Sequence, residues 1–357
     1  MRRSVVVVAL GALALGAALL NGGCSSASYY RQSVAGHLDL VWRARSIDDW
    51  LADPRTDGAL RARLQLAHAV REWAVAALKL PDTASYRRYA ALDRPAAVWN
   101  VVAAPELSLV LKTWCFPVLG CVGYRGYYAR EDADALAASL RTEGLEVAVY
   151  GVPAYSTLGW LEWLGGDPLL STFIGWPDGE LARLIFHELA HQVVYVADDT
   201  TFNESFATAV ERLGVRRWLA ERASPEARAA YEAFDARRRD FRALTLRTRQ
   251  ALAAIYADPT LDDAAKRRAK AAQMAAMRAE HLRLKHERWG GFAGYDRWFE
   301  QANNATLGVQ GAYDDLVPAF ERLFEREGRD FDRFYARVRV IAALPREERL
   351  ATLRTLP

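Results

Sequence analysis

The sequence of 357 residues contains little cysteine, methionine and histidine, with three Cys, three Met and six His. Three cysteines in so long a chain exclude a small scaffold held together by disulfides. There is also no internal repeat and no low-complexity linker. With 52% hydrophobic and 25% charged residues, the composition is that of a packed globular protein with one large domain or two closely packed ones. The function must therefore be sought in a site.

An excess of charge of one sign is lacking as well. The chain has 47 Lys and Arg against 44 Asp and Glu, and its arginine-rich stretches also contain acidic residues. A nucleic-acid-binding protein is expected to present a strongly basic face. We therefore expect no nucleic-acid partner.

Signals for serine or cysteine hydrolase chemistry are missing. The sequence has no Gly-x-Ser-x-Gly segment, and neither Cys115 nor Cys121 lies at the expected start of a helix. These two cysteines are close enough in sequence to form a small disulfide loop in an oxidising compartment, and two free buried thiols are the alternative.

The first residues of the chain differ from the rest. Two arginines precede an uncharged, mostly apolar run from Ser4 to Leu20, which predicts a signal peptide over residues 1–23, with a permanent membrane span as the alternative. The segment Leu20-Asn21-Gly22-Gly23-Cys24 resembles a bacterial lipoprotein cleavage box. That resemblance implies a lipid on Cys24 and a membrane anchor. Cys24 is followed by Ser25 and not by Asp, so we expect the lipid anchor to hold the protein on the periplasmic side of the outer membrane.

The remaining chain, residues 24–357, reads as a mainly helical α+β protein. Helical spacing of apolar residues covers Ala35 to Trp50 and Asp57 to Leu80. Runs rich in β-branched and aromatic residues predict a small mixed sheet, with a helix from Arg130 to Glu143 between the last two strands; these runs are Val98 to Val102, Leu107 to Phe116 and Leu145 to Val152. The stretch from about 217 to 288, dense in Ala, Arg, Glu and Leu, predicts a long helical hairpin.

The segment His187-Glu188-Leu189-Ala190-His191 carries the strongest functional signal. We expect a helix beginning near Pro177, with Asp178 as its N-cap. Residues four apart lie one turn apart on a helix, so both imidazoles can reach one metal ion. Glu188, about 100° further round the helix, is suited to be the general base that takes a proton from a metal-activated water.

A catalytic zinc needs a third protein ligand. The acidic residues that follow the motif are Asp198, Asp199, Glu204 and Glu211. Glu204 is the preferred ligand, because residues 197–201 can turn the chain and a second helix can then run back beside the first. Val194 occupies the position of the glycine in H-E-x-x-H-x-x-G-x-x-H and excludes that ligand set. Ligand type and motif favour Zn²⁺.

The whole segment from His187 to Leu213 resembles the corresponding sequence of the glutamate-type zincin peptidases. The lipoprotein start, the stretch Phe-Asn-Glu-Ser-Phe-Ala at 202–207, and the later Asn-Asn-Ala and Tyr-Asp-Asp-Leu-Val-Pro-Ala-Phe segments are similar to a family of bacterial zinc aminopeptidases. The resemblance implies a zincin-like fold, zinc, a peptide substrate and aminopeptidase activity. In such enzymes a tyrosine often stabilises the oxyanion, and Tyr313 is the candidate here, followed by Tyr155.

Other functions remain open at this point. The same zinc chemistry would serve an envelope endopeptidase, since the Gly-x-Met-Glu-Asn segment of one aminopeptidase clan is absent. A zinc-containing envelope assembly protein without peptidase activity is the alternative of a different class, because long charged hairpins often contact partners.

Overall fold

The computed structural model describes residues 24–116, 120–154, 165–310 and 316–355, and in these the protein is a mainly helical α+β fold, as the sequence predicts. The helices are α2 (Cys24–Arg43), α3 (Ile47–Ala52), α4 (Gly58–Leu78), α5 (Arg130–Thr142), α6 (Asp178–Ala190), α7 (Thr200–Arg222), α8 (Pro225–Ala257), α9 (Asp263–Glu287), α10 (Asp296–Gln301), α11 (Asn304–Gln310), α12 (Val317–Arg326), α13 (Phe331–Ala342) and α14 (Arg346–Arg354). The strands are β1 (Arg45–Ser46), β2 (Arg88–Ala90), β3 (Val98–Pro105), β4 (Trp114–Phe116), β5 (Gly120–Val122), β6 (Arg125–Tyr127), β7 (Leu145–Val152) and β8 (Leu169–Leu170).

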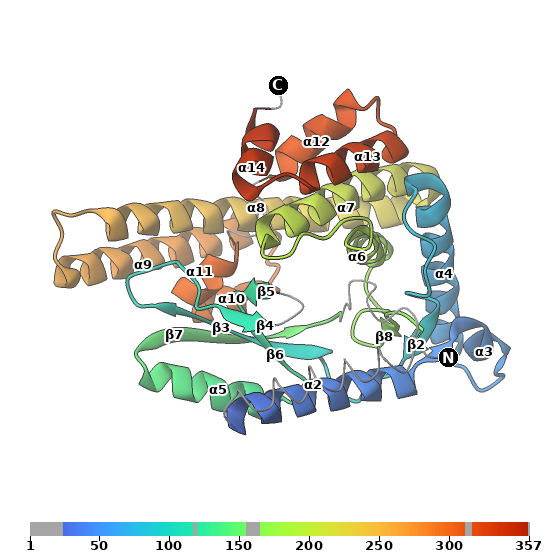
Figure 1. Ribbon diagram of the computed structural model, residues 1–357, viewed down its shortest axis with the longest axis horizontal. Coiled ribbons are helices and arrows are strands. Elements are labelled where there is room, and N and C mark those ends of the chain that lie inside the picture. Colours follow the sequence, from blue (N-terminus) through green and yellow to red (C-terminus); the bar gives the residue numbers. More distant parts are fainter. Residues whose placement is uncertain (1–23, 117–119, 155–164, 311–315, 356–357) are drawn as a thin grey trace, which may run out of the picture.

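The largest sheet has the order β6-β3-β7 and is antiparallel throughout. Side chains alternate between its faces because successive residues of a strand point to opposite sides. Val101 and Ala103 face α5, whereas Val102 and Ala104 face α11. The sheet therefore lies between two helices, with α5 below it and the helical layer above it in Figure 1.

A second small sheet, β1-β2-β8, joins an antiparallel pair to a parallel pair, and β4 and β5 form a separate hairpin. The prediction of one strand from Leu107 to Phe116 is wrong for residues 107–113. Pro105 ends β3, and the chain turns at Glu106 and Leu107. The apolar side chains that suggested a strand pack against helices instead, with Leu109 on the α8–α10 cluster and Leu111 near α11.

The helix expected from Ala35 to Trp50 is likewise two helices, α2 and α3. Ser46 interrupts it, because its side chain accepts a hydrogen bond from the backbone N–H of Asp49 and so caps α3. Asp57 caps α4 in the same way, with bonds from the N–H groups of Ala59 and Leu60.

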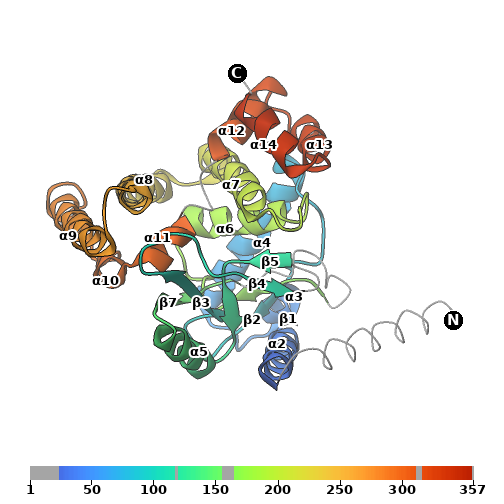
Figure 2. The same cartoon turned by 60° about the vertical axis from the view of Figure 1, so that its left-hand side comes forward.

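The main core is helical. Helices α4, α6, α7 and α12 to α14 share one buried apolar cluster, and Figure 2 shows α12 to α14 packed beside α7. Helices α6 and α7 approach closely at Gly214, where a Cβ atom would lie 2.6 Å from Leu78 and 3.0 Å from Phe186. Glycine is therefore needed at this crossing, which fixes the two helices that carry the candidate site.

Helices α8 and α9 run side by side and project to the left of the sheet in Figure 1. They enclose a second apolar cluster with α10, while residues 217–222 belong to α7. Among the described residues, no helix combines the length and the apolar character needed to cross a membrane.

Asn304 connects this hairpin to the sheet. Its fully buried side chain donates hydrogen bonds to the carbonyls of Pro105 and Glu106 and accepts one from the Tyr256 hydroxyl at 2.8 Å. We predict that Asn304→Ala lowers the free energy of unfolding by about 2 kcal/mol, since buried polar partners lose their bonds. Urea denaturation of both proteins measures this change. Gln301→Ala removes an exposed amide nearby and should change stability by less than about 0.5 kcal/mol; equal effects of the two substitutions would contradict the role of Asn304.

Candidate metal centre

The H-E-x-x-H motif lies on α6, whose apolar residues Leu181, Ile185 and Leu189 are fully buried in the main core. Burial of that face leaves His187 and Glu188 partly accessible on the other side. The expectation that Asp178 is the N-cap is wrong, because Asp178 is the first helical residue. Pro177 occupies the cap position, and the Asp178 carboxylate pairs with Arg63 at 2.5 Å.

His191 forms the C-cap of α6 and keeps a helical backbone conformation, with φ −59° and ψ −23°. It therefore stays one turn beyond His187 although the helix ends at Ala190. The rings of the two histidines lie 4.8 Å apart between centroids.

The chain then turns back into α7. Asp199 caps that helix by accepting a bond from the N–H of Phe202, and it pairs with Arg349 at 3.1 Å. Asn203, one turn later, donates to the carbonyl of Val196 and accepts from its N–H, at 2.7 and 2.8 Å. It holds the turn together and is not a helix cap.

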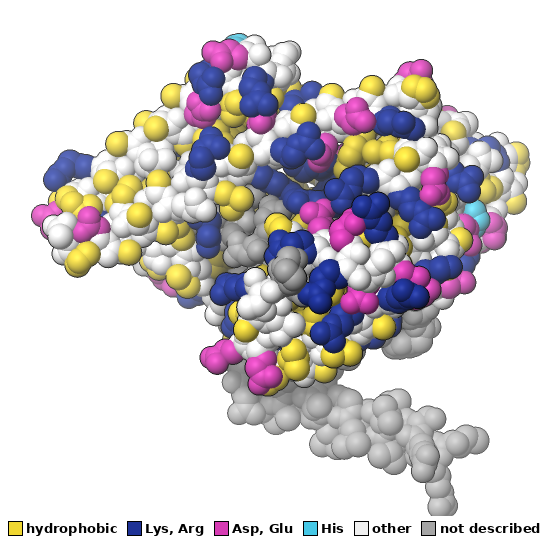
Figure 3. Space-filling view, turned by 90° about the horizontal axis from the view of Figure 1, so that it is seen from above, with side chains coloured by type: hydrophobic (Ala, Val, Ile, Leu, Met, Phe, Trp, Pro, Cys, Tyr) yellow, Lys and Arg dark blue, Asp and Glu magenta, His cyan; other side chains and the backbone are white. Residues whose placement is uncertain are grey.

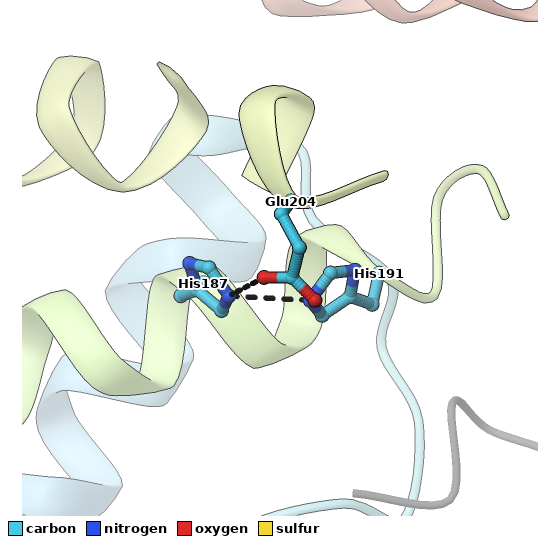
Figure 4. Close-up of side chains that lie close together, drawn as sticks. All are labelled: His187, His191 and Glu204. Atoms are coloured by element: carbon cyan, nitrogen blue, oxygen red, sulfur yellow. Dashed lines mark hydrogen bonds and ion pairs between the residues drawn. The ribbon is translucent and has the colours of Figure 1, made fainter. Parts of the chain in front are cut away.

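The turn brings Glu204 opposite the two histidines (Figure 4). One Glu204 oxygen lies 3.3 Å from Nε2 of His187, and the other lies 3.8 Å from Nε2 of His191. The two Nε2 atoms are 3.2 Å apart. One donor atom from each residue lies within 4.8 Å of the others, so the three residues form a candidate metal site.

These donors fit a tetrahedral metal ion. Two ligands at about 2.0–2.1 Å from a tetrahedral ion are about 3.3 Å apart. The separations of 3.2 and 3.3 Å match this value, and the 3.8 Å between Glu204 and Nε2 of His191 is somewhat longer. The charges agree as well. Burial lowers the pKa of His187, but hydrogen bonds to Glu204 and Glu211 outweigh that effect and raise it to about 10. The buried carboxylates thus favour a positive charge at this place.

Glu211 fixes the orientation of His187, although nothing in the sequence distinguishes it from the other acidic residues of α7. Its carboxylate is 3% exposed and accepts a bond from Nδ1 of His187 at 3.0 Å, which leaves Nε2 free to face the metal position. The other oxygen accepts from Arg183 at 3.0 Å. Burial raises the pKa of Glu211, but Arg183 and His187 outweigh it and lower the value to about 2.

Glu188, the predicted general base, lies near Tyr86, which the sequence did not single out. Burial raises the pKa of Tyr86 well above its usual value, and the charges of Glu188 and Asp167 raise it further. Tyr86 is 1% exposed, has a left-handed backbone with φ +63°, and its hydroxyl has no hydrogen-bond partner among the described residues. An acidic residue at the cleft, such as Asp167, would support recognition of the free α-amine by an aminopeptidase, but Asp167 is only 2% exposed and is therefore not an open binding group.

Tyr313 and Tyr155, the candidate oxyanion donors, lie outside the described residues. Three other tyrosines lie near the metal ligands instead. Partial burial raises the pKa of Tyr124, Tyr150 and Tyr195, and the charge of Glu204 raises each further. A single sequence gives no signal for them, because they come from the β5–β6 turn, β7 and the α6–α7 connection.

Cys115 and Cys121 are joined by a disulfide across the β4–β5 hairpin. The N–H of Cys121 donates to the Asp198 carboxylate at 2.8 Å, so the hairpin contacts the connection between the two metal-binding helices. Asp198 and Asp199 are thus occupied elsewhere and do not join the cluster.

Gln192 supports the end of the motif helix. Its side chain accepts a bond from the Thr83 hydroxyl and donates one to Ser85. Cys24, the expected lipidation site, is the first residue of α2.

Glu211→Gln should weaken metal binding about 10–100-fold, because the neutral amide no longer fixes His187 as a carboxylate does. Competition with a zinc-binding dye measures the affinity, and thermal unfolding checks that the variant folds. The control is Glu232→Gln, which removes an exposed carboxylate on the neighbouring helix and should bind zinc like the wild type. Equal affinities of the two variants would show that Glu211 does not support the site.

The chain was compared with known proteins, and one comparison gives a match that includes the residues of this site. Neither a curated protein nor a solved structure matches the chain. One family model, described as "Putative aminopeptidase", matches residues 28–353, which include His187, Glu188, His191 and Glu204. That match covers nearly the whole chain, and the protein therefore belongs to this aminopeptidase family.

Proposed function

We propose that the protein is a zinc-dependent peptidase, and most specifically an aminopeptidase, with His187, His191 and Glu204 as metal ligands. The observation that carries the proposal is that two histidines of the α6 motif and Glu204 of α7 come together next to Glu188. The family match supports peptidase activity. Two imidazoles and a carboxylate at tetrahedral spacing support zinc.

Each residue has a defined task in this proposal. A zinc ion, when bound, supplies a water of lowered pKa and polarises the peptide carbonyl. Glu188 takes the proton of that water and returns it to the amine that leaves. Glu211 keeps the Nε2 atom of His187 directed at the metal position. Tyr313 stays the predicted oxyanion donor, and Tyr124, Tyr150 and Tyr195 are further candidates among the described residues.

Glu188→Gln should reduce kcat about 10²–10⁴-fold, since the amide cannot accept the proton, while zinc content stays at about one ion per chain as in other three-ligand catalytic sites. Hydrolysis of aminoacyl and internally quenched peptides, together with metal analysis, tests this expectation. Glu347→Gln, at an exposed position on α14, is the control and should retain full activity. Unchanged peptidase activity in Glu188→Gln would rule out this mechanism.

Blocking the N-terminus of the substrate distinguishes an exopeptidase from an endopeptidase. An aminopeptidase recognises the free α-amine, so acetylation of a peptide should lower kcat/KM at least about 100-fold, the effect of leaving polar groups of the site unpaired. Comparison of matched free and acetylated peptides measures this ratio. Similar values for both, with cleavage of internally quenched peptides, would assign an endopeptidase instead.

A second candidate function is that of a zinc-containing assembly protein of the cell envelope. The projecting α8–α9 hairpin motivates it, because such an arm offers a long surface to a partner (Figure 1). Full biological rescue of a deletion strain by the Glu188→Gln protein would favour this function over catalysis.

The proposed location is the periplasmic side of the outer membrane, with a lipid anchor on Cys24. Support comes from the apolar N-terminal run and the lipoprotein-like box. The Cys115–Cys121 disulfide is in keeping with an oxidising compartment. Peptides are the proposed substrates, and no nucleic-acid partner is proposed.

A further inference from the structure

Behind the candidate metal centre, α6, α7, α8 and α12 enclose a cavity of about 520 Å³. Seven arginines and four carboxylates line it, and with Glu180, which pairs with Arg183 and Arg238, seven positive charges meet five negative ones. Figure 3 shows Lys and Arg side chains gathered around a hollow near the middle of this face. The near-neutral charge of the whole chain conceals this local excess.

Three of the four acidic residues in the lining, Glu211, Asp235 and Glu321, pair with its arginines. Asp235 is shared by Arg238 and Arg239, at 3.2 and 2.5 Å. Glu211 is divided between Arg183 and His187. The carboxylates of the wall therefore do not neutralise its arginines one for one.

Arginines at different depths could contact one ligand. Arg242 is half-buried and Arg239 is exposed, whereas the buried Arg238 is already held by Glu180 and Asp235. The guanidinium group binds phosphate oxygens through two parallel N–H bonds, which makes clustered arginines a phosphate-binding arrangement. Repulsion among the like charges also favours an anion in the cavity.

Part of the wall is apolar. Val215, Leu219 and Tyr231 line the cavity and are at most 8% exposed. The volume falls within the range of about 300–1,000 Å³ that is typical of small-molecule sites, and it exceeds what an inorganic ion needs. We infer that the cavity binds a small organic phosphate, whose phosphate contacts the arginines and whose carbon portion lies against Tyr231 and Leu219.

This inference does not depend on peptidase activity. Glu211 nevertheless belongs to both places, since one oxygen binds His187 and the other binds Arg183 in the cavity wall. The test must therefore show that the phosphate is bound in the cavity and not at the metal.

The experiment is a calorimetric titration with glycerol 3-phosphate. The protein contains residues 24–357 and is measured at physiological salt in the presence of zinc. We expect one ligand per chain, and Arg239→Gln and Arg242→Gln should each raise Kd about tenfold, because each removes a charge-assisted contact. Arg247→Gln, at an exposed position of α8 outside the cavity lining, is the matched control and should change Kd less than twofold. Thermal unfolding verifies that each variant is folded.

Two further arms make the outcome decisive. Glu204→Ala should raise the Kd of glycerol 3-phosphate by no more than about tenfold, the size of a modest coupling through Glu211, and complete loss of binding there would place the phosphate on the metal and overturn the inference. Inorganic phosphate should bind at least several-fold more weakly than the ester; equal affinity would remove the role of the apolar wall. Absence of binding at millimolar ligand, or equal Kd values in all three arginine variants, would also overturn it.

Discussion

The carboxylate of Glu211 is the link on which the arrangement of the candidate site depends. It joins His187 of α6 to its own helix α7, and through Arg183 it continues to Glu180, which is held by Arg238 of α8 in a two-pronged pair at 2.8 and 2.9 Å. Three helices are thus tied by one chain of buried charges. Removal of a single member would leave its partner charged and unpaired in a medium of low dielectric constant, which is costly.

The three residues of the candidate metal site could be brought together from the sequence because their geometry is local. His187 and His191 share a face wherever residues four apart lie on a helix, and Glu204 follows after a connection just long enough to reverse the chain. Glu211 was not distinguishable in the same way. It is one of several acidic residues on α7, and only the packing of α7 against α6 shows which of them reaches the free nitrogen of His187.

In the fold, too, elements formed by local sequence patterns could be predicted, whereas elements formed by pairing of distant segments could not. Strands β3 and β7 coincide with β-branched runs that the sequence displays openly. Strands β1 and β8 have two residues each, and β8 pairs with β2 about 80 positions away, so no periodicity announces them. Tyr86 belongs to this second class. Its burial beside Glu188 results from the packing of distant segments, and its left-handed backbone has no sequence signal in a tyrosine.

The balance of charge over the chain hides two opposite local imbalances. Carboxylates around buried imidazoles favour a cation at the metal centre, whereas clustered arginines favour an anion in the cavity behind it. Glu211 belongs to both, because its two oxygens face different sides. An anion that attracts Arg183 reduces the positive charge acting on Glu211, and this strengthens Glu211 as an acceptor for His187. Linkage requires the reverse effect of equal size: a cation at the centre must change the affinity of the cavity by the same factor.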